Sequence, residues 1–296
     1  FSISANKRPS AVPPPVGRTS FACRFSRLTS GFGAVDFHYW GKSRSDSPPM
    51  MISRPRSIAV GACAGPDLEL ALVVQPVMHL GSRHPSAIAY ECLLRVVEGT
   101  QLAAPARLIA SAEADGSIVD LDRWVVSQAA RIAGAFPNVH LWVNASQISV
   151  SDIRFIEHAI SEFDRHEVTS RMTFEITESA DGDACKIVKG LERLNLKAMP
   201  VMLDDLRDGF AKRQLLMNRA VTGCKLSRRT TRDIAESPAV RGEVEKLVRD
   251  CRAAGKRVVL EGIEDAAELE IARALEIEFC QGFYFGRPAL PEYLFG

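Results

Sequence analysis

The feature that most constrains the fold is an alternation of short apolar runs with longer amphipathic stretches from residue 67 onward. The spacing of apolar residues predicts a helical region over 105–134 and helices over 151–163, 183–194, 239–254 and 265–275. Strands that alternate with helices in this way are typical of parallel βαβ units. The apolar runs between the helices are LELALVV, AIAYECLL, VHLWVN, RMTFE, AMPVMLDD, VTGCK, RVVLE and EFCQGFYF.

About eight strands in roughly 230 residues match a (β/α)₈ barrel, which typically has about 250 residues. An open, doubly wound sheet is the alternative, but the chain has neither a GxGxxG turn after its first strand nor a GxxxxGK[ST] loop. We therefore predict an α/β fold, with a TIM-like barrel over residues 66–296.

Residues 1–65 are predicted to form a disordered tail rich in Ser, Pro and Arg, because this composition cannot bury enough apolar surface to order itself. Residues 1–60 carry nine Lys and Arg against two Asp. A basic tail can bind nucleic acid or anionic lipid, but its aromatic residues are not interleaved with basic ones, so we do not expect a nucleic acid polymer as partner. The chain opens with Phe, and Met50 and Met51 precede the barrel, so an alternative is that the tail is a gene-start artefact.

The seven cysteines are scattered, without CxxC or Cys/His ligand spacing. This pattern indicates neither a disulfide framework nor a zinc site, and it favours a reducing, cytoplasmic location. No stretch approaches 18 consecutive apolar residues, so we expect no transmembrane segment.

Polar side chains end one predicted strand after another. The carboxyl ends of barrel strands lie on one face, where active sites of this fold occur. We therefore expect these side chains to converge. They are Glu91, Asn144, Glu175, Asp204, Asp205, Lys225, Glu261 and Gln281.

Each of these positions also has a structural interpretation. Asp204 or Asp205 could cap the following helix, Glu261 could lie in a solvated turn, and Lys225 could be a surface lysine. Independent caps, however, have no reason to be carboxylates at several different strand ends. The set as a whole favours a site.

Carboxylates gathered at one mouth repel one another unless their pKa values rise or cations bind. Oxygen ligands suit Mg²⁺ or Mn²⁺ rather than zinc. Adjacent aspartates such as Asp204 and Asp205 can bridge two ions, which is an arrangement used for in-line phosphodiester cleavage. Lys225 could then hold or deprotonate the attacking water, or stabilise phosphate oxygens.

The same residues resemble, in order and spacing, the EAL family of cyclic di-GMP phosphodiesterases. The resemblance covers roughly residues 67–296. It implies a modified barrel with one antiparallel strand, a homodimer, and hydrolysis of cyclic di-GMP to linear pGpG with two Mg²⁺ or Mn²⁺ ions. The motifs that carry it are VVQPV, ECLLR (for E-A-L-L-R), LDRWV, LWVNAS, FEITES, LDD, CKL, LEGIE and QGFYFGRP.

The resemblance also implies roles for individual residues. Lys225 matches the lysine that assists the attacking water, with Glu261 beside it, and Glu178 matches the glutamate that braces the loop after the two aspartates. One metal would be held by Glu91, Asn144, Glu175 and Asp204, and a second by Asp204, Asp205 and Glu261. The positions near the ligand are Gln75, Arg95, Asp122, Glu264 and Gln281.

The chain departs from the family pattern in several places. Cys92 replaces the alanine of the signature, which we expect to matter little because a free cysteine packs as a small hydrophobe. After Asp205 the family's F-G-T-G-Y-S-S-L becomes LRDGFAKR, in which Arg207 offers an internal cation beside the aspartates. This altered loop, 206–213, supports a second hypothesis: a catalytically weak or inactive cyclic di-GMP receptor or protein-interaction module.

Overall fold

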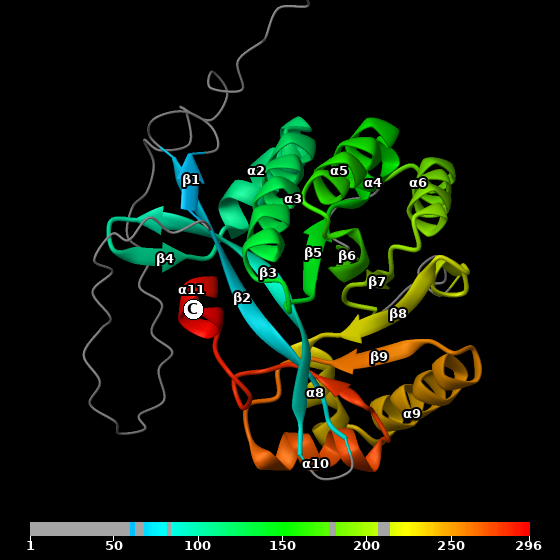
Figure 1. The fold of residues 1–296 in the computed structure, drawn as a ribbon. Coiled ribbons are helices and arrows are strands. Elements are labelled where there is room, and N and C mark those ends of the chain that lie inside the picture. The colour runs from blue at the N-terminus through cyan, green and yellow to red at the C-terminus, as the bar shows by residue number, and fades with distance from the viewer. Residues whose placement is uncertain (1–59, 63–67, 82–83, 178–181, 207–213) are drawn as a thin grey trace, which may run out of the picture.

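A computed structural model describes residues 60–62, 68–81, 84–177, 182–206 and 214–296. Eight strands form a closed ring in the order β2-β10-β9-β8-β7-β6-β5-β3, and β3 pairs again with β2 (Figure 1). The barrel prediction is therefore confirmed. The strands are β2 (Glu69–His79), β3 (Ser86–Glu98), β5 (Leu141–Ala145), β6 (Met172–Ile176), β7 (Val201–Leu203), β8 (Val221–Leu226), β9 (Arg257–Leu260) and β10 (Phe279–Cys280).

Strand β2 runs against the direction of the other seven. It is antiparallel to both of its neighbours, β3 and β10, while every other neighbouring pair in the ring is parallel. This is the single antiparallel strand that the family resemblance implied. The alternation of strands and helices could not have indicated it, because strand direction leaves no mark on an apolar run.

Strands β2 and β3 extend beyond the barrel and carry a small lobe. Strand β1 (Val60–Ala62) pairs with the start of β2, and β4 (Gln101–Ala103) pairs with the end of β3. Strand β1 lies within 1–65, the range predicted to be a disordered tail, whereas residues 1–59 are outside the described residues. The lobe has a core of its own, formed by Leu70, Leu108, Ala112, Ile118 and Leu121.

The helices surround the ring of strands (Figure 1). The helical region predicted over 105–134 consists of two helices, because Gly116, with a φ of 79°, ends the first of them. In the described ranges, no helix is both long enough and apolar enough to cross a membrane. The helices are α2 (Ala106–Asp115), α3 (Ile118–Ala135), α4 (Gln147–Ser151), α5 (Ile153–Arg165), the 3₁₀ turn η2 (Thr169–Arg171), α6 (Ala184–Leu196), α8 (Arg228–Glu236), α9 (Pro238–Ala253), α10 (Ala266–Ala274) and α11 (Pro291–Phe295).

Strand β10 is shorter than the run EFCQGFYF predicted. The Gln281 N–H still donates to the Leu260 carbonyl at 3.0 Å, which extends the pairing with β9 by one residue. The chain then turns, as the Phe285 N–H bonds to the Gly282 carbonyl at 3.1 Å. Gln281 therefore stands at the point where the strand ends.

Candidate active site

An apolar layer fills the barrel beneath its mouth. We use this name for the end of the barrel at which Glu91, Glu175, Asp204, Lys225 and Glu261 meet. The layer consists of buried side chains from several strands, among them Ala89, Trp142, Met202 and Val259. Successive side chains of a strand point to opposite faces, so the residue two positions further along points the same way. That rule places polar side chains directly above the apolar layer. They are Glu91, Asn144, Asp204 and Glu261.

Lys225, at the end of β8, lies at the centre of the mouth. Its side chain is 1% exposed. Four carboxylates from four different strands surround its ammonium nitrogen, so the predicted convergence is seen directly in the ion pairs, although Glu91 lies within β3 and not at its end. The distances from Nζ are 2.5 Å to Glu261 Oε1, 3.2 Å to Glu91 Oε2, 3.3 Å to Glu175 Oε2 and 3.7 Å to Asp204 Oδ1.

Amide side chains hold Glu91 in place within this cluster. Asn144 Nδ2 donates to Glu91 Oε1 at 3.1 Å, and Gln281 Nε2 donates to Glu91 Oε2 at 2.7 Å. Gln281 Nε2 also donates to Gln75 Oε1 at 3.2 Å, and Gln75 Nε2 donates to the Gly286 carbonyl at 3.0 Å. The two glutamines predicted to lie near the ligand therefore connect β2, β3 and β10 around one metal-ligand candidate.

The charges of the cluster are strongly perturbed. Burial raises the pKa of Glu175 well above its usual value, although Lys225 opposes the shift. Burial likewise raises the pKa of Glu261, to about 7. For Lys225, burial alone would lower the pKa, but the surrounding carboxylates outweigh it and raise the pKa well above its usual value. Glu91 has a lowered pKa, because Lys225 and its hydrogen bonds outweigh burial. One ammonium among four carboxylates thus leaves an excess of negative charge.

The donor chemistry of the mouth fits a hard divalent cation. Carboxylate and amide oxygens are the ligands that Mg²⁺ and Mn²⁺ prefer. Asn144 Oδ1 and Glu175 Oε1 are buried oxygens without a hydrogen-bond partner among the described residues, and native structures rarely leave such atoms unsatisfied. As they stand, however, no group of three or more His, Cys, Asp or Glu side chains in the described ranges is arranged to hold an ion; the carboxylates converge on Lys225.

Backbone hydrogen bonds fix the residues that come directly after β7. The Asp204 N–H donates to the Ile176 carbonyl at 2.9 Å, and the Leu206 N–H donates to the Lys225 carbonyl at 3.0 Å. Between them, Asp205 has a φ of 39° and donates its N–H to Asp204 Oδ1 at 3.0 Å. The backbone of Asp205 is therefore directed at the Asp204 carboxylate, and its role beside a second metal stays a prediction. Glu178 and residues 207–213, including Arg207, lie outside the described residues.

Asp122 is placed away from the ion-pair cluster. Its carboxylate accepts a hydrogen bond from the Ser146 N–H at 2.9 Å and another from the Ser149 hydroxyl at 2.6 Å, at the start of α4. Burial raises its pKa to about 6. Asp122 thus connects α3 to the loop that directly follows Asn144, and its described hydrogen bonds are to the protein itself.

Arg95 and Glu264 also lie outside the cluster. Arg95 is on the part of β3 that extends beyond the barrel, donates from Nη1 to the Leu94 carbonyl at 2.7 Å, and has a pKa lowered by burial. Glu264 accepts an ion pair from Arg228 Nη2 at 2.6 Å. Arg228 was not among the predicted site residues, although it follows β8 by two residues and the strand-end rule would have included it.

Cys92, the substitution in the signature motif, is buried as expected of a cysteine that packs as a small hydrophobe. Cys92 is 1% exposed and belongs to the main hydrophobic core. Its carbonyl accepts a hydrogen bond from Asn144 Nδ2 at 3.4 Å. The thiol therefore occupies a buried position, and the backbone at this position contacts a predicted metal ligand.

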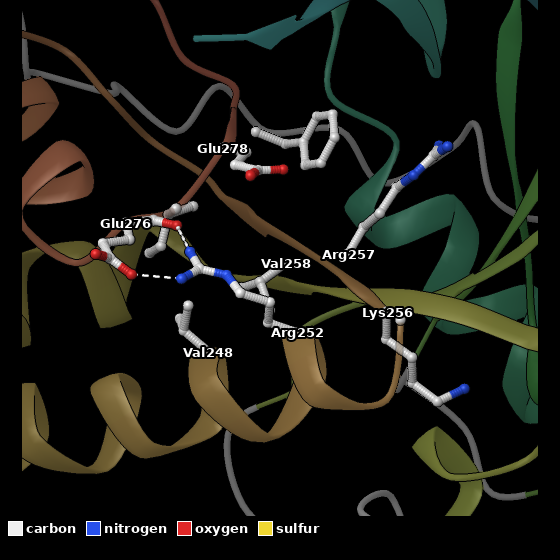
Figure 2. Close-up of a pocket in the computed structure, with 10 residues that line it drawn as sticks. Val248, Arg252, Lys256, Arg257, Val258, Glu276 and Glu278 are labelled. Carbon is white, nitrogen blue, oxygen red and sulfur yellow. Dashed lines mark hydrogen bonds and ion pairs between the residues drawn. The ribbon is translucent and has the colours of Figure 1, made fainter. Parts of the chain in front are cut away.

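A pocket of about 240 Å³ lies at the opposite end of the barrel, where β9 and β10 begin (Figure 2). Its Arg252 pairs with the carboxylate of Glu276 and donates from Nη2 to the Glu276 carbonyl at 2.7 Å. Lys256 extends away from that pair, and its Nζ donates to the carbonyls of Asn218 and Val221 at 3.0 and 2.6 Å. Because these cations are already engaged, the mouth is the stronger candidate for an active site.

Comparisons of the sequence with known proteins agree on one family. The family model described as EAL domain matches residues 66–288. A cyclic di-GMP phosphodiesterase of Pseudomonas aeruginosa is 27% identical over 260 residues, which cover 84% of this chain and 44% of the relative. The bifunctional diguanylate cyclase/cyclic di-GMP phosphodiesterase MucR of the same organism is 27% identical over 217 residues, which cover 70% and 31%. The chain thus spans less than half the length of these relatives.

Solved structures give the same result for the fold. The MucR phosphodiesterase in its c-di-GMP complex superposes with a TM-score of 0.69 at 26% identity, over 76% of this chain and 94% of that one. The FimX EAL domain of Xanthomonas citri, in complex with c-diGMP, gives a TM-score of 0.67 at 24% identity, over 77% and 91%. The similarity therefore covers the barrel nearly completely.

Proposed function

Since the chain belongs to the EAL-domain family, we propose that the mouth of its barrel hydrolyses cyclic di-GMP to linear pGpG in the presence of Mg²⁺ or Mn²⁺. The observation that carries this proposal is the convergence of four carboxylates from four strands on Lys225. Such an excess of negative charge in a buried mouth favours bound cations. Relatives named as cyclic di-GMP phosphodiesterases support the choice of substrate.

The reaction opens one of the two phosphodiester bonds of the cyclic dinucleotide. A water oxygen bonds to phosphorus, the bond from phosphorus to the 3′ oxygen breaks, and the 3′ oxygen takes up a proton. When bound, divalent cations activate the water and neutralise charge on the phosphate. Glu91, Asn144, Glu175 and Asp204 would hold one ion, and Asp204, Asp205 and Glu261 the other.

Residues of the chain itself would orient the reactants. Lys225 donates hydrogen bonds to the attacking water and places a positive charge near the phosphate oxygens. Arg95, whose guanidinium is half-buried on β3, grips a phosphate with its forked donors. Gln75, Asp122, Glu264 and Gln281 remain proposed contacts of the ligand or of its surroundings.

The first test is a hydrolysis assay on the full chain with cyclic di-GMP and Mg²⁺ or Mn²⁺, in which chromatography separates pGpG. We expect turnover by the wild type and losses of at least about 100-fold in kcat for Glu91→Ala and Lys225→Ala. Glu270→Ala, which removes an exposed carboxylate on α10, should match the wild type. Folded, metal-supplied protein that forms no linear product would refute the proposal.

A receptor function is the alternative, and the altered sequence at 206–213 favours it. A receptor would bind cyclic di-GMP without turnover, and it would do so equally well in the presence of a metal chelator. Isothermal titration with cyclic di-GMP, with and without the chelator, separates the two functions. Hydrolysis supports the enzyme, while tight metal-independent binding of an intact ligand supports the receptor.

We make two further proposals, the first from the family resemblance and the second from the scattered cysteines. The first is that the chain forms a homodimer, which light scattering of the full chain should report as twice the mass of one chain. The second is that it works in the cytoplasm. Fractionation of cells that express the full protein would test that location.

A further inference from the structure

Among the described residues, the Lys225 ammonium is the positive charge that balances the carboxylates of the mouth. In the described ranges, the ion pairs of Glu91, Glu175, Asp204 and Glu261 are all made to this one nitrogen. Because the Lys225 side chain is 1% exposed, water cannot solvate its charge. The carboxylates thus stabilise the lysine, and the lysine stabilises the carboxylates.

The orientation of individual oxygens shows which of them contact Lys225 and which could contact a metal ion. Glu175 turns Oε2 toward Lys225 at 3.3 Å, while its Oε1 is buried without a hydrogen-bond partner among the described residues. Asn144 likewise donates from Nδ2 to Glu91, while its Oδ1 is buried without a described partner. Two metal-type oxygens therefore have no described hydrogen-bond partner, whereas one oxygen of each of the four carboxylates is directed at the ammonium.

An ammonium and a divalent cation would draw on the same oxygens. The attraction between unit charges about 3 Å apart is strong where water is excluded, and removing one partner of a buried ion pair leaves an uncompensated charge. Like charges brought into one site also repel. A cation that enters the mouth therefore has to replace contacts that Lys225 now makes.

We propose that Lys225 is the built-in counterion of the metal-free mouth, and that divalent cations bind there in competition with its ammonium. The inference concerns the site of the proposed function and rests on it in naming a divalent cation as the ligand. It assigns Lys225 a second property, because it makes the lysine a regulator of metal affinity. Removal of the ammonium should then strengthen metal binding even as it removes catalysis.

The test measures Mn²⁺ alone, without substrate, on the full chain. Titration calorimetry compares the wild type with Lys225→Met, which keeps the length of the side chain but loses its charge. Lys256→Met is the matched control, because Lys256 donates to backbone carbonyls at the other end of the barrel. We expect the Kd for Mn²⁺ to fall about tenfold or more in Lys225→Met and to stay at the wild-type value in Lys256→Met.

Equal or weaker Mn²⁺ binding by Lys225→Met would overturn the inference. If that variant does not fold without metal, urea unfolding is followed with and without Mn²⁺. Mn²⁺ should then restore the fold and raise the unfolding midpoint far more than in the wild type; no rescue would contradict the inference. Because these measurements omit cyclic di-GMP, an inactive protein that passes them would refute the proposed hydrolysis alone.

Discussion

At the scale of single residues, Asp122 shows how a motif match and a physical role can differ. The resemblance places it near the ligand, but its described hydrogen bonds go to Ser146 and Ser149 at the start of α4. Ser146 follows Asn144 by two residues. Asp122 is therefore positioned to set the conformation of the loop that leaves β5 at the mouth, and any effect of its loss on the substrate would also reflect that loop.

The buried carboxyl of Asp122 predicts a pH effect on stability. Burial raises its pKa from 3.8 to about 6, so folding favours the protonated form. Its contribution to the free energy of unfolding is greatest below pH 3.8, declines as the pH rises to about 6, and amounts to roughly 3 kcal/mol over that range. Asp122→Asn should remove this part of the pH dependence, as measured by urea unfolding between pH 4 and 8.

The control for that measurement lies on the same helix. Asp120→Asn removes an exposed carboxylate of α3 and should leave the pH dependence unchanged. If Asp122→Asn and the wild type lose stability in parallel over this range, the burial of Asp122 does not have the energetic consequence assigned to it.

At the scale of elements, the division of the predicted helical region 105–134 into α2 and α3 has a single backbone cause. Gly116 has a φ of 79° and follows α2 directly. A left-handed residue stops the helical hydrogen-bond pattern, and glycine is the usual residue there. The apolar spacing continues across the break because α2 and α3 both bury one face. Periodicity alone therefore does not show where the first helix ends and the second begins.

A pair of glycine substitutions tests this explanation. A Cβ added at Gly116 or at Gly242 of α9 would meet no atom within 4 Å, so the two sites differ chiefly in backbone conformation. Gly116→Ala should destabilise the fold by about 1 kcal/mol, because alanine resists positive φ. Gly242→Ala should stabilise it by about 0.5–1 kcal/mol, because alanine favours a helix interior. Chemical denaturation measures both, and changes of the same sign would contradict the account.

The sequence predicted the kind and order of the barrel elements better than their geometry. Apolar runs that end in polar residues located the mouth correctly, because strand ends in a barrel share one face. Hydrophobicity could not give the direction of β2, which depends on the hairpin connection to β3. The partners of Asp122 were also beyond reach, because they lie on an element that meets α3 only in the folded chain.

At the scale of the whole molecule, the ring closes through β2, the strand nearest the start of the barrel. Strand β1 lies along the first residues of β2, with Val60 opposite Ala71 and Ala62 opposite Glu69. The small lobe therefore supplies hydrogen bonds to β2, the strand through which the barrel closes. Whether the domain begins at 60 or at 66 has an energetic consequence.

Two shortened chains measure that consequence. A chain of residues 60–296 keeps β1 and should unfold at the same temperature as the full chain. A chain of residues 66–296 loses the pairing with β2, and each kcal/mol lost should lower its melting temperature by about 2–4 °C. Calorimetry of the three proteins provides the comparison. Identical melting temperatures for the two shortened chains would place the domain start after β1.

The reversed strand also determines where the barrel can be attached to anything else. In a barrel of parallel strands the chain enters at the end opposite the active site. Here β2 passes through the mouth at Gln75, and its first residues lie beyond it, beside the extended end of β3. A segment joined ahead of β1 is therefore attached on the same side of the barrel as the mouth, beside the first residues of β2. We expect a domain joined there to lie nearer to the mouth than to the opposite end of the barrel.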